Sequence, residues 1–313
     1  ALGFSRPQYA HMSVTVSEGG GKLSKRERAK TLKQAVKAAG DIDMAALASA
    51  GGLSEGQLSD FLAGESSPDQ PAITAMADYL GTGLPEINVV DFLNSGYVPE
   101  ALVNFVALLG WNPGDGREVM AVDELIKAFD ITRLTKSNSL FDRKKLISFN
   151  TEHMKMLSAD KLLAHFRDYL EIIDSPVKNG EDELLKRIIR LCEGARTLAD
   201  IEKKSRFLFT ADDKIEFEPK TVKKVLKKEG AMDRLKLVRE RLAEMDDYSE
   251  QGLEKMLRAL AEEKEVGLGK VAQPLRAALC GTMVSLPIFD AVNILGIDST
   301  LARIDNTLVK YGP

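Results

Sequence analysis

Gly19-Gly20-Gly21-Lys22-Leu23-Ser24-Lys25-Arg26 decides the fold of this 313-residue chain, because it joins a strand-like segment to a basic helix. Glycines allow the backbone to approach a ligand closely, and two lysines three residues apart can place positive charge against a polyphosphate. The preceding segment, residues 7–16, alternates enough to predict a strand. Nucleotides bind α/β folds where a loop leaves the edge of the sheet. The stretch therefore predicts a phosphate-binding loop.

The same residues suggest two other interpretations, a Walker-type phosphate loop and a flexible surface loop. A Walker-type phosphate loop is excluded, because Val16 stands where its first glycine belongs and Leu23 where its Ser or Thr belongs. A flexible basic surface loop fits Gly-Gly-Gly-Lys on its own. The choice between a ligand site and a surface loop therefore depends on the rest of the chain.

Four blocks of sequence resemble one family. Residues 22–26 are similar to the second signature of class I aminoacyl-tRNA synthetases, in the form typical of glutamyl and glutaminyl enzymes. Three further blocks resemble bacterial glutamyl enzymes in the same order: residues 96–115, residues 141–146 with Asn150, and residues 269–279 with Gly281. Glutaminyl relatives end in β-barrels, so the helical tail predicted here favours the bacterial glutamyl type.

The resemblance implies a glutamate–tRNA ligase that uses ATP with Mg²⁺. It implies that Lys25, with Lys22, stabilises the charge that builds on the pyrophosphate leaving group. The backbone around Leu23 would touch the adenine, and Ser24 and Arg26 would steady the loop. No metal ligand is expected in this portion.

The resemblance also implies residues that bind tRNA. In the family, the helix and turn before Thr197-Leu198 approach the anticodon, which singles out Arg187, Arg190 and Arg196. Members that are strict for glutamate anticodons usually carry an arginine three residues before that Thr-Leu, where this chain has Gly194. The expected partner is therefore tRNA(Glu), with tRNA(Gln) accepted through relaxed discrimination.

Gln273 and Arg276 lie in the block that resembles the distal anticodon domain, so both are further candidates for binding tRNA. The sequence leaves open whether either is instead a helix-cap or packing residue. A run of basic residues offers phosphate contacts, although most such runs are solvated faces. Its members are Lys220, Lys223, Lys224, Lys227, Lys228, Arg234, Lys236, Arg239 and Arg241.

Residues 1–18 are too few to hold the first signature of the family, a His-Ile-Gly-His-type tetrad. We therefore expect the C-terminal part of a longer enzyme, inactive in adenylate formation by itself. A free-standing tRNA-binding module derived from a synthetase is the alternative. The expected domains are the end of the catalytic domain (1–30), a helical insertion (31–87), a stem-contact helical region (88–156) and an anticodon-binding domain (157–313) with two subdomains that meet near residue 230.

The expected fold is mainly α, with a remnant of a class I α/β catalytic domain. Glycines and apolar periodicity predict helices in the insertion and beyond it. Their expected ranges are 25–39, 44–50, 55–63, 71–80, 97–109, 122–129, 141–156, a helix from 158, 182–192, 198–209, 220–229, 233–244, 249–264, 271–280 and 288–295.

Charge is segregated along the chain. Residues 38–116 contain eleven acidic side chains and no Lys or Arg, whereas residues 1–37 contain eight basic and two acidic ones. Residues 53–81 superficially resemble a phage-repressor helix-turn-helix. Such an acidic segment would repel a DNA backbone, so we expect no DNA partner and a structural or protein-contact insertion.

Composition limits the remaining classes. With 29% charged residues, no basic-then-apolar leader and no long apolar run, the chain is expected to be a cytoplasmic protein that does not interact with membranes, and a monomer. Cys192 and Cys280 are isolated and only three histidines are present, so neither a disulfide framework nor a zinc site is expected.

Overall fold

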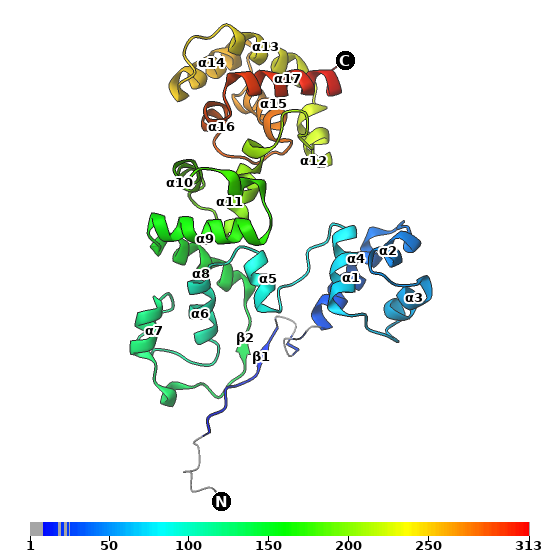
Figure 1. Ribbon diagram of the computed structural model, residues 1–313, viewed down its shortest axis with the longest axis vertical. Coiled ribbons are helices and arrows are strands. Elements are labelled where there is room, and N and C mark those ends of the chain that lie inside the picture. Colours follow the sequence, from blue (N-terminus) through cyan, green and yellow to red (C-terminus); the bar gives the residue numbers. More distant parts are fainter. Residues whose placement is uncertain (1–8, 18–19, 22–23, 25, 313) are drawn as a thin grey trace, which may run out of the picture. The chain divides into compact units, whose positions relative to one another are not determined.

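The computed structural model describes residues 9–17, 20, 21, 24 and 26–312. They form two compact units, divided between His153 and Met154 (Figure 1). The expectation of a mainly α fold is confirmed, because two short strands accompany a long series of helices in the described residues.

The strand before the loop is much shorter than predicted. Strand β1 (Thr15–Val16) pairs in parallel with β2 (Ser139–Leu140). The Ser139 and Phe141 amides donate to the carbonyls of Val14 and Val16, at 3.1 and 2.8 Å. Because β2 offers only two residues, the ladder ends there and the earlier part of residues 7–16 has no partner strand. Residues 7 and 8 lie outside the described residues.

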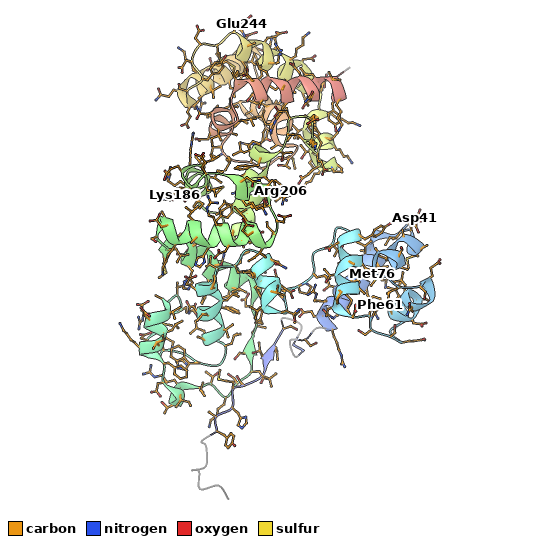
Figure 2. The ribbon with its side chains drawn as sticks, viewed as in Figure 1. Asp41, Phe61, Met76, Lys186, Arg206 and Glu244 are labelled. Carbon is orange, nitrogen blue, oxygen red and sulfur yellow. The ribbon has the colours of Figure 1, made fainter. Side chains whose placement is uncertain are left out.

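The insertion is a small helical bundle. It contains α1 (Arg26–Ala39), α2 (Met44–Ala50), α3 (Glu55–Ala63) and α4 (Gln70–Tyr79). Asp43, Ser54 and Asp69 cap the last three, each accepting a backbone amide with its side chain. Its core is fully buried and includes Phe61 and Met76, which Figure 2 labels, with Leu32, Leu47 and Ile73.

The remainder of the first unit packs around aromatic rings. Its helices are α5 (Val89–Asn94), α6 (Pro99–Ala107), α7 (Val122–Ala128) and α8 (Arg143–Met156), with a 3₁₀ turn η1 (Ile131–Arg133). Phe105 meets both Phe141 and Phe149 edge-on. Trp111 is buried and donates its indole N–H to the Asp130 carbonyl at 3.1 Å, as expected for a core residue.

The second unit begins with three helices and two 3₁₀ turns. These are α9 (Ala159–Ile172), η2 (Pro176–Asn179), α10 (Asp182–Leu191), α11 (Leu198–Ser205) and η3 (Arg206–Phe209). Ser158 caps α9 through the Lys161 amide. The helix expected over 198–209 thus changes from α to 3₁₀ after Ser205.

The later part of the second unit holds an extensive apolar core. This core includes Leu235, Leu257, Leu275 and Ile304. The helices that pack around it are α13 (Ala231–Ala243), α14 (Glu250–Glu263), α15 (Gly269–Cys280), α16 (Ile288–Leu295) and α17 (Ile297–Tyr311).

One predicted helix of this part is wrong in form. The helix expected over 220–229 is a turn of α12 (Pro219–Thr221) followed by a π-helix, η4 (Val222–Leu226). Thr221, Val225 and Leu226 are buried in this segment.

Arg303 holds this unit together from the inside. Only 2% of its surface is exposed, and its guanidinium contacts Asp212 Oδ1 at 2.6 Å. It also donates to the carbonyls of Phe207, Thr210 and Leu279, at 3.0, 2.7 and 2.8 Å. A buried arginine that satisfies one carboxylate and three carbonyls fixes η3 and the loop after it against α15 and α17.

Candidate nucleic-acid interface

The predicted phosphate-binding loop is described only in part. Lys22, Leu23 and Lys25, which carry the expected catalytic and ATP-binding roles, lie outside the described residues. Ser17 and Gly21 close a turn through the Ser17 amide and the Gly21 carbonyl at 2.8 Å, and Gly20 has a left-handed φ of +76°. Ser24 lies just before α1, and Arg26 is exposed at its first residue. The described part of the loop therefore leaves β1 and enters α1 as the sequence predicted.

Two residues fasten the insertion to the body of the first unit. Arg28 on α1 donates to Asp91 on α5 at 3.0 Å and to Thr74 on α4 at 2.9 Å. The same oxygen of Asp91 accepts the amides of Ile87 and Asn88, at 2.9 and 2.8 Å. Burial alone would raise the pKa of Asp91, but the two amides and the Arg28 charge lower it overall. The entry and the exit of the insertion thus meet at one carboxylate.

The first group of predicted tRNA-binding residues surrounds the end of α10. Arg187 is partly withdrawn from solvent, because it donates to Asp290 and to Asn293 at 3.0 Å each. Arg190, one turn later, is exposed and makes no ion pair among the described residues. Arg196 is also exposed. Arg190 and Arg196 are therefore exposed to solvent, while Arg187 braces α10 against α16.

The turn that carries Gly194 is well defined. Thr197 caps α11, and Asp200 Oδ2 accepts the amides of Arg196 and Thr197 at 2.9 and 3.2 Å. Gly194 is exposed, has a φ of +84° and faces open space where a side chain would project. An arginine at this position would have room, although it would sit in the left-handed region that favours glycine.

Gln273 and Arg276 lie on α15, both half-buried. Neither the Gln273 Oε1 nor the Arg276 Nε atom has a hydrogen-bond partner among the described residues. Unsatisfied buried polar atoms are rare in folded proteins and call for an explanation such as a ligand or a water. Neither residue caps a helix, so the sequence alternatives narrow to packing or RNA contact.

The basic run after residue 219 divides into two kinds of residue. Arg239 makes a two-pronged pair with Asp305 at 3.0 Å, and Arg241 pairs with Glu263 at 3.0 Å. Six lysines of the run are exposed and have no ion pair among the described residues: Lys220, Lys223, Lys224, Lys227, Lys228 and Lys236. The lysines, and not these two arginines, carry the uncompensated positive charge.

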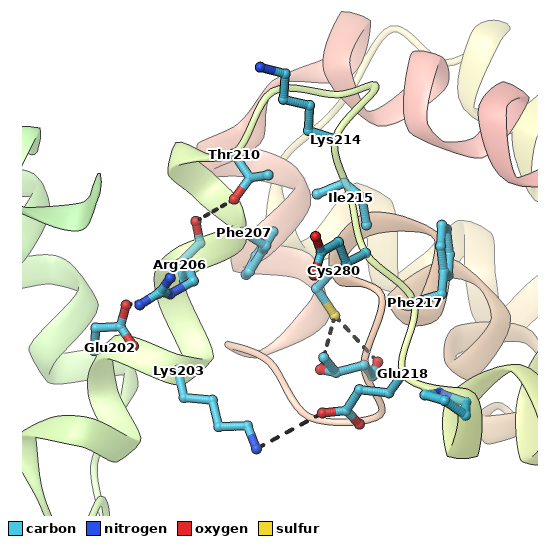
Figure 3. Close-up of a pocket in the computed structure, with 13 residues that line it drawn as sticks. Glu202, Lys203, Arg206, Phe207, Thr210, Lys214, Ile215, Phe217, Glu218 and Cys280 are labelled. Carbon is cyan, nitrogen blue, oxygen red and sulfur yellow. Dashed lines mark hydrogen bonds and ion pairs between the residues drawn. The ribbon is translucent and has the colours of Figure 1, made fainter. Parts of the chain in front are cut away.

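A cavity with a volume of about 620 Å³ lies beside η3 (Figure 3). Its charges compensate one another: Arg206 pairs with Glu202 at 2.7 Å and Lys203 approaches Glu218 at 3.9 Å. Cys280 lies in its wall with a thiol whose pKa is raised by burial. This mixture of charges gives the cavity no preference for a polyanion.

The described residues contain neither a cluster of metal-ligating side chains nor a helix suited to crossing a membrane. No group of three or more His, Cys, Asp or Glu side chains is arranged to hold a metal ion. No described helix combines the length and the apolar character needed to cross a membrane.

Three protein families match separate parts of the chain. Residues 86–148 match the catalytic domain of class I tRNA synthetases (E and Q), and residues 161–308 match the anticodon binding domain. Residues 32–87 match a helix-turn-helix family. The first match covers two of the blocks quoted from the sequence, and the second covers the predicted anticodon region.

Individual relatives agree with the family matches. The chain is 34% identical over 221 residues to the glutamate–tRNA ligase of Thermodesulfovibrio yellowstonii, which is 69% of this chain and 46% of that protein. It is 35% identical over 222 residues to glutamate–tRNA ligase 1 of Syntrophus aciditrophicus, 71% of this chain and 46% of that protein. The chain spans about half the length of the curated relatives it matches.

Solved structures show the same relationship. The crystal structure of a glutamate tRNA ligase from Elizabethkingia meningosepticum, in complex with its amino acid, matches 99% of this chain and 53% of its own. The TM-score is 0.64 at 25% identity. By fold and by family, the chain belongs to the class I aminoacyl-tRNA synthetases. Within that class it corresponds to a portion of a glutamyl-tRNA synthetase, as the sequence blocks predicted.

The helix-turn-helix match changes the description of the insertion. The sequence resemblance over residues 53–81, judged superficial, extends to a family match over 32–87. Helix α3 exposes Glu55 and Asp60, and α2, α3 and α4 contain no basic residue. Within the matched residues the positive charges lie on α1, at Lys33 and Lys37, while the later helices carry acidic side chains.

Proposed function

We propose that this chain is part of an enzyme that activates glutamate with ATP and Mg²⁺ and esterifies it to tRNA(Glu). The second unit would bind the anticodon end of the tRNA, and residues 22–26 would bind the ATP phosphates. The observation that supports this most directly is the anticodon-binding family match over residues 161–308, which contains the exposed Arg190 and Arg196.

The chemistry assigned to the loop follows from charge. ATP with Mg²⁺ supplies a pyrophosphate leaving group on which negative charge grows during adenylate formation. Lys25 would stabilise that charge more in the transition state than in the ground state, with Lys22 beside it. Leu23 would meet the adenine through its backbone, and Ser24 and Arg26 would hold the loop at the start of α1.

Titration of the chain with tRNA(Glu) tests the proposal. An arginine that contacts a base or phosphate contributes about 1–3 kcal/mol, so Arg190→Ala should weaken binding roughly tenfold. Arg258→Ala is the matched control, since Arg258 is exposed on α14 and pairs only with Glu254. Binding of tRNA(Glu) no tighter than that of an unrelated RNA of equal length would refute the proposal.

Gly194 supports relaxed discrimination between tRNA(Glu) and tRNA(Gln). With open space instead of an arginine, nothing at this position would contact the anticodon base by which the two RNAs differ. Gly194→Arg should lower the affinity for tRNA(Gln) relative to tRNA(Glu). If the unmodified chain already prefers tRNA(Glu) over tRNA(Gln) as strongly as the Gly194→Arg variant does, relaxed discrimination is excluded.

Three further features belong to the same proposal. The acidic helix-turn-helix insertion would be a structural or protein-contact element, and a salt-sensitive gel shift with duplex DNA would contradict this. Cytoplasmic location accords with a role in translation, and the monomeric state is checked by sedimentation. A free-standing tRNA-binding module remains the alternative; it would bind tRNA, whereas the gene that encodes it would contain no glutamate and ATP pocket.

A further inference from the structure

We propose that a pocket formed by η4, α13 and the start of α15 holds a backbone phosphate of the bound RNA. This rests on the proposed tRNA-binding function and adds to it a pocket in which three cations of the basic run meet Lys270. The pocket has a volume of about 410 Å³. Its charged lining residues are Lys224, Lys228, Arg234 and Lys270. We call it the four-cation pocket.

The π-helix brings two of the lysines to the pocket. The Lys227 amide donates to the Val222 carbonyl at 2.9 Å, five residues back, which widens the turn. Val225 and Leu226 then point into the core, while Lys224 and Lys228 remain exposed on the pocket side. Single π-turns are uncommon and occur frequently at functional sites.

A proline inside α15 fixes the arginine. Pro274 has no N–H, so the Lys270 carbonyl loses its usual helical partner. Arg234 Nε donates to that carbonyl at 2.9 Å, and its Nη2 donates to the Glu229 carbonyl at 3.0 Å. A side chain on Gly230 would come within 2.7 Å of Arg234 Nη1, so the glycine leaves space for the guanidinium.

The charges of the pocket are of one sign. None of its lining residues is acidic, and none of the four cations makes an ion pair among the described residues. The larger cavity in Figure 3 differs because acidic residues also line it: Glu202 pairs with Arg206, and Glu218 with Lys203. Arg234 is directed to two carbonyls that carry no net charge, so its positive charge is not neutralised.

A phosphate group fits this arrangement. Lysines contact phosphates as point charges, and an arginine held in place loses little further entropy on binding one. Gln273, a residue expected to contact tRNA, lies in the same wall. A phosphate in the pocket would therefore lie close to Gln273.

The salt dependence of tRNA(Glu) binding tests this inference. Each neutralised phosphate contributes about 0.7–0.9 to the slope of log K against log salt. Lys224→Ala/Lys228→Ala should reduce the slope by about one and weaken binding several-fold at low salt. Lys224→Arg/Lys228→Arg should restore the slope. Lys161→Ala/Lys255→Ala, which removes two exposed lysines outside the pocket, should have a much smaller effect.

The outcomes separate this inference from the proposed function. An unchanged slope in Lys224→Ala/Lys228→Ala, with normal tRNA binding by the unmodified chain, overturns the pocket alone. Failure of the unmodified chain to bind tRNA overturns both. Tripolyphosphate serves as the second probe. If it shifts the amide resonances of Gly269 and Lys270 while tRNA does not, the pocket binds free polyphosphate and the RNA assignment is wrong.

Discussion

Arg28 Nη1 lies 3.0 Å from Asp91 Oδ2, so a residue at the start of the insertion is paired with one just beyond its end. The side chains of both are largely buried. Removing one partner of a buried pair leaves the other without compensation and costs about 3–5 kcal/mol. Arg28→Ala should therefore lower the free energy of unfolding of the first unit by this order.

Hydrogen exchange can locate that effect. In Asp91→Asn the carboxylate that accepts the Ile87 and Asn88 amides becomes a weaker acceptor, so these two amides should exchange faster than in the unmodified chain. Arg117→Ala is the control, because Arg117 pairs with Asp115 and both are half exposed. Unchanged exchange at Ile87 and Asn88 would show that the pair does not hold the exit of the insertion.

Arg303 should be the most important charged residue for the stability of the second unit. Arg303→Ala removes one ion pair and orphans three carbonyls, so we expect a loss of about 3–5 kcal/mol in urea unfolding. Arg258→Ala, which breaks an exposed pair with Glu254, should cost no more than about 0.5 kcal/mol. Comparable losses in the two variants would contradict the role given to Arg303.

Two glycines allow a matched test of backbone geometry. Gly281 has a φ of +72°, and a Cβ there would overlap the Glu216 carbonyl oxygen. Gly64 is also left-handed, with a φ of +94°, but a Cβ there would meet nothing closer than Lys33 Nζ at 3.8 Å. Gly64→Ala should cost about 1 kcal/mol for the left-handed conformation, and Gly281→Ala roughly 2–4 kcal/mol because the clash is added. Thermal unfolding of both variants gives the comparison.

His153 gives the first unit a dependence on pH. It is buried and contacts Asn104 Oδ1 at 2.9 Å, and burial lowers its pKa below the ordinary 6.5. Below pH 6.5 His153 binds a proton more readily in the unfolded chain than in the folded chain. The contribution of the neutral His153 to the free energy of unfolding is therefore complete above that pH and declines as the pH falls through it.

The measurement is the free energy of unfolding at about pH 8 and about pH 5. The loss between the two should be smaller in His153→Gln than in the unmodified chain. His165→Gln serves as the control, because His165 is only half-buried. An identical pH dependence in the unmodified chain and His153→Gln would remove His153 as the cause.

Local signals predicted much of the fold. Helices α2, α3 and α16 have the predicted bounds, because Asp43 and Ser54 cap the first two and glycines follow all three. Family blocks, not periodicity, predicted the class of the protein.

Features that depend on distant residues were missed or inexact. Helix α17 was not predicted, although Gly296 before it separates it from α16, and β1 was predicted too long because the length of its partner is not visible in its own sequence. Arg187 pairs with Asp290, 103 residues away, so the sequence could not show that it is partly occupied. Lys224, Lys228 and Arg234 were named from the sequence as possible phosphate contacts, but Lys270 was not, because only the fold brings α15 beside them.

Asp91 also has a consequence for engineering. Because Arg28 and Ile87 reach the same carboxylate oxygen, the two ends of the helix-turn-helix segment lie within the length of one arginine side chain and its neighbour. A segment with such adjacent ends is a separate insertion in the polypeptide. It can be exchanged for another small domain, or for a short linker, without stretching the polypeptide that leads from β1 to α5.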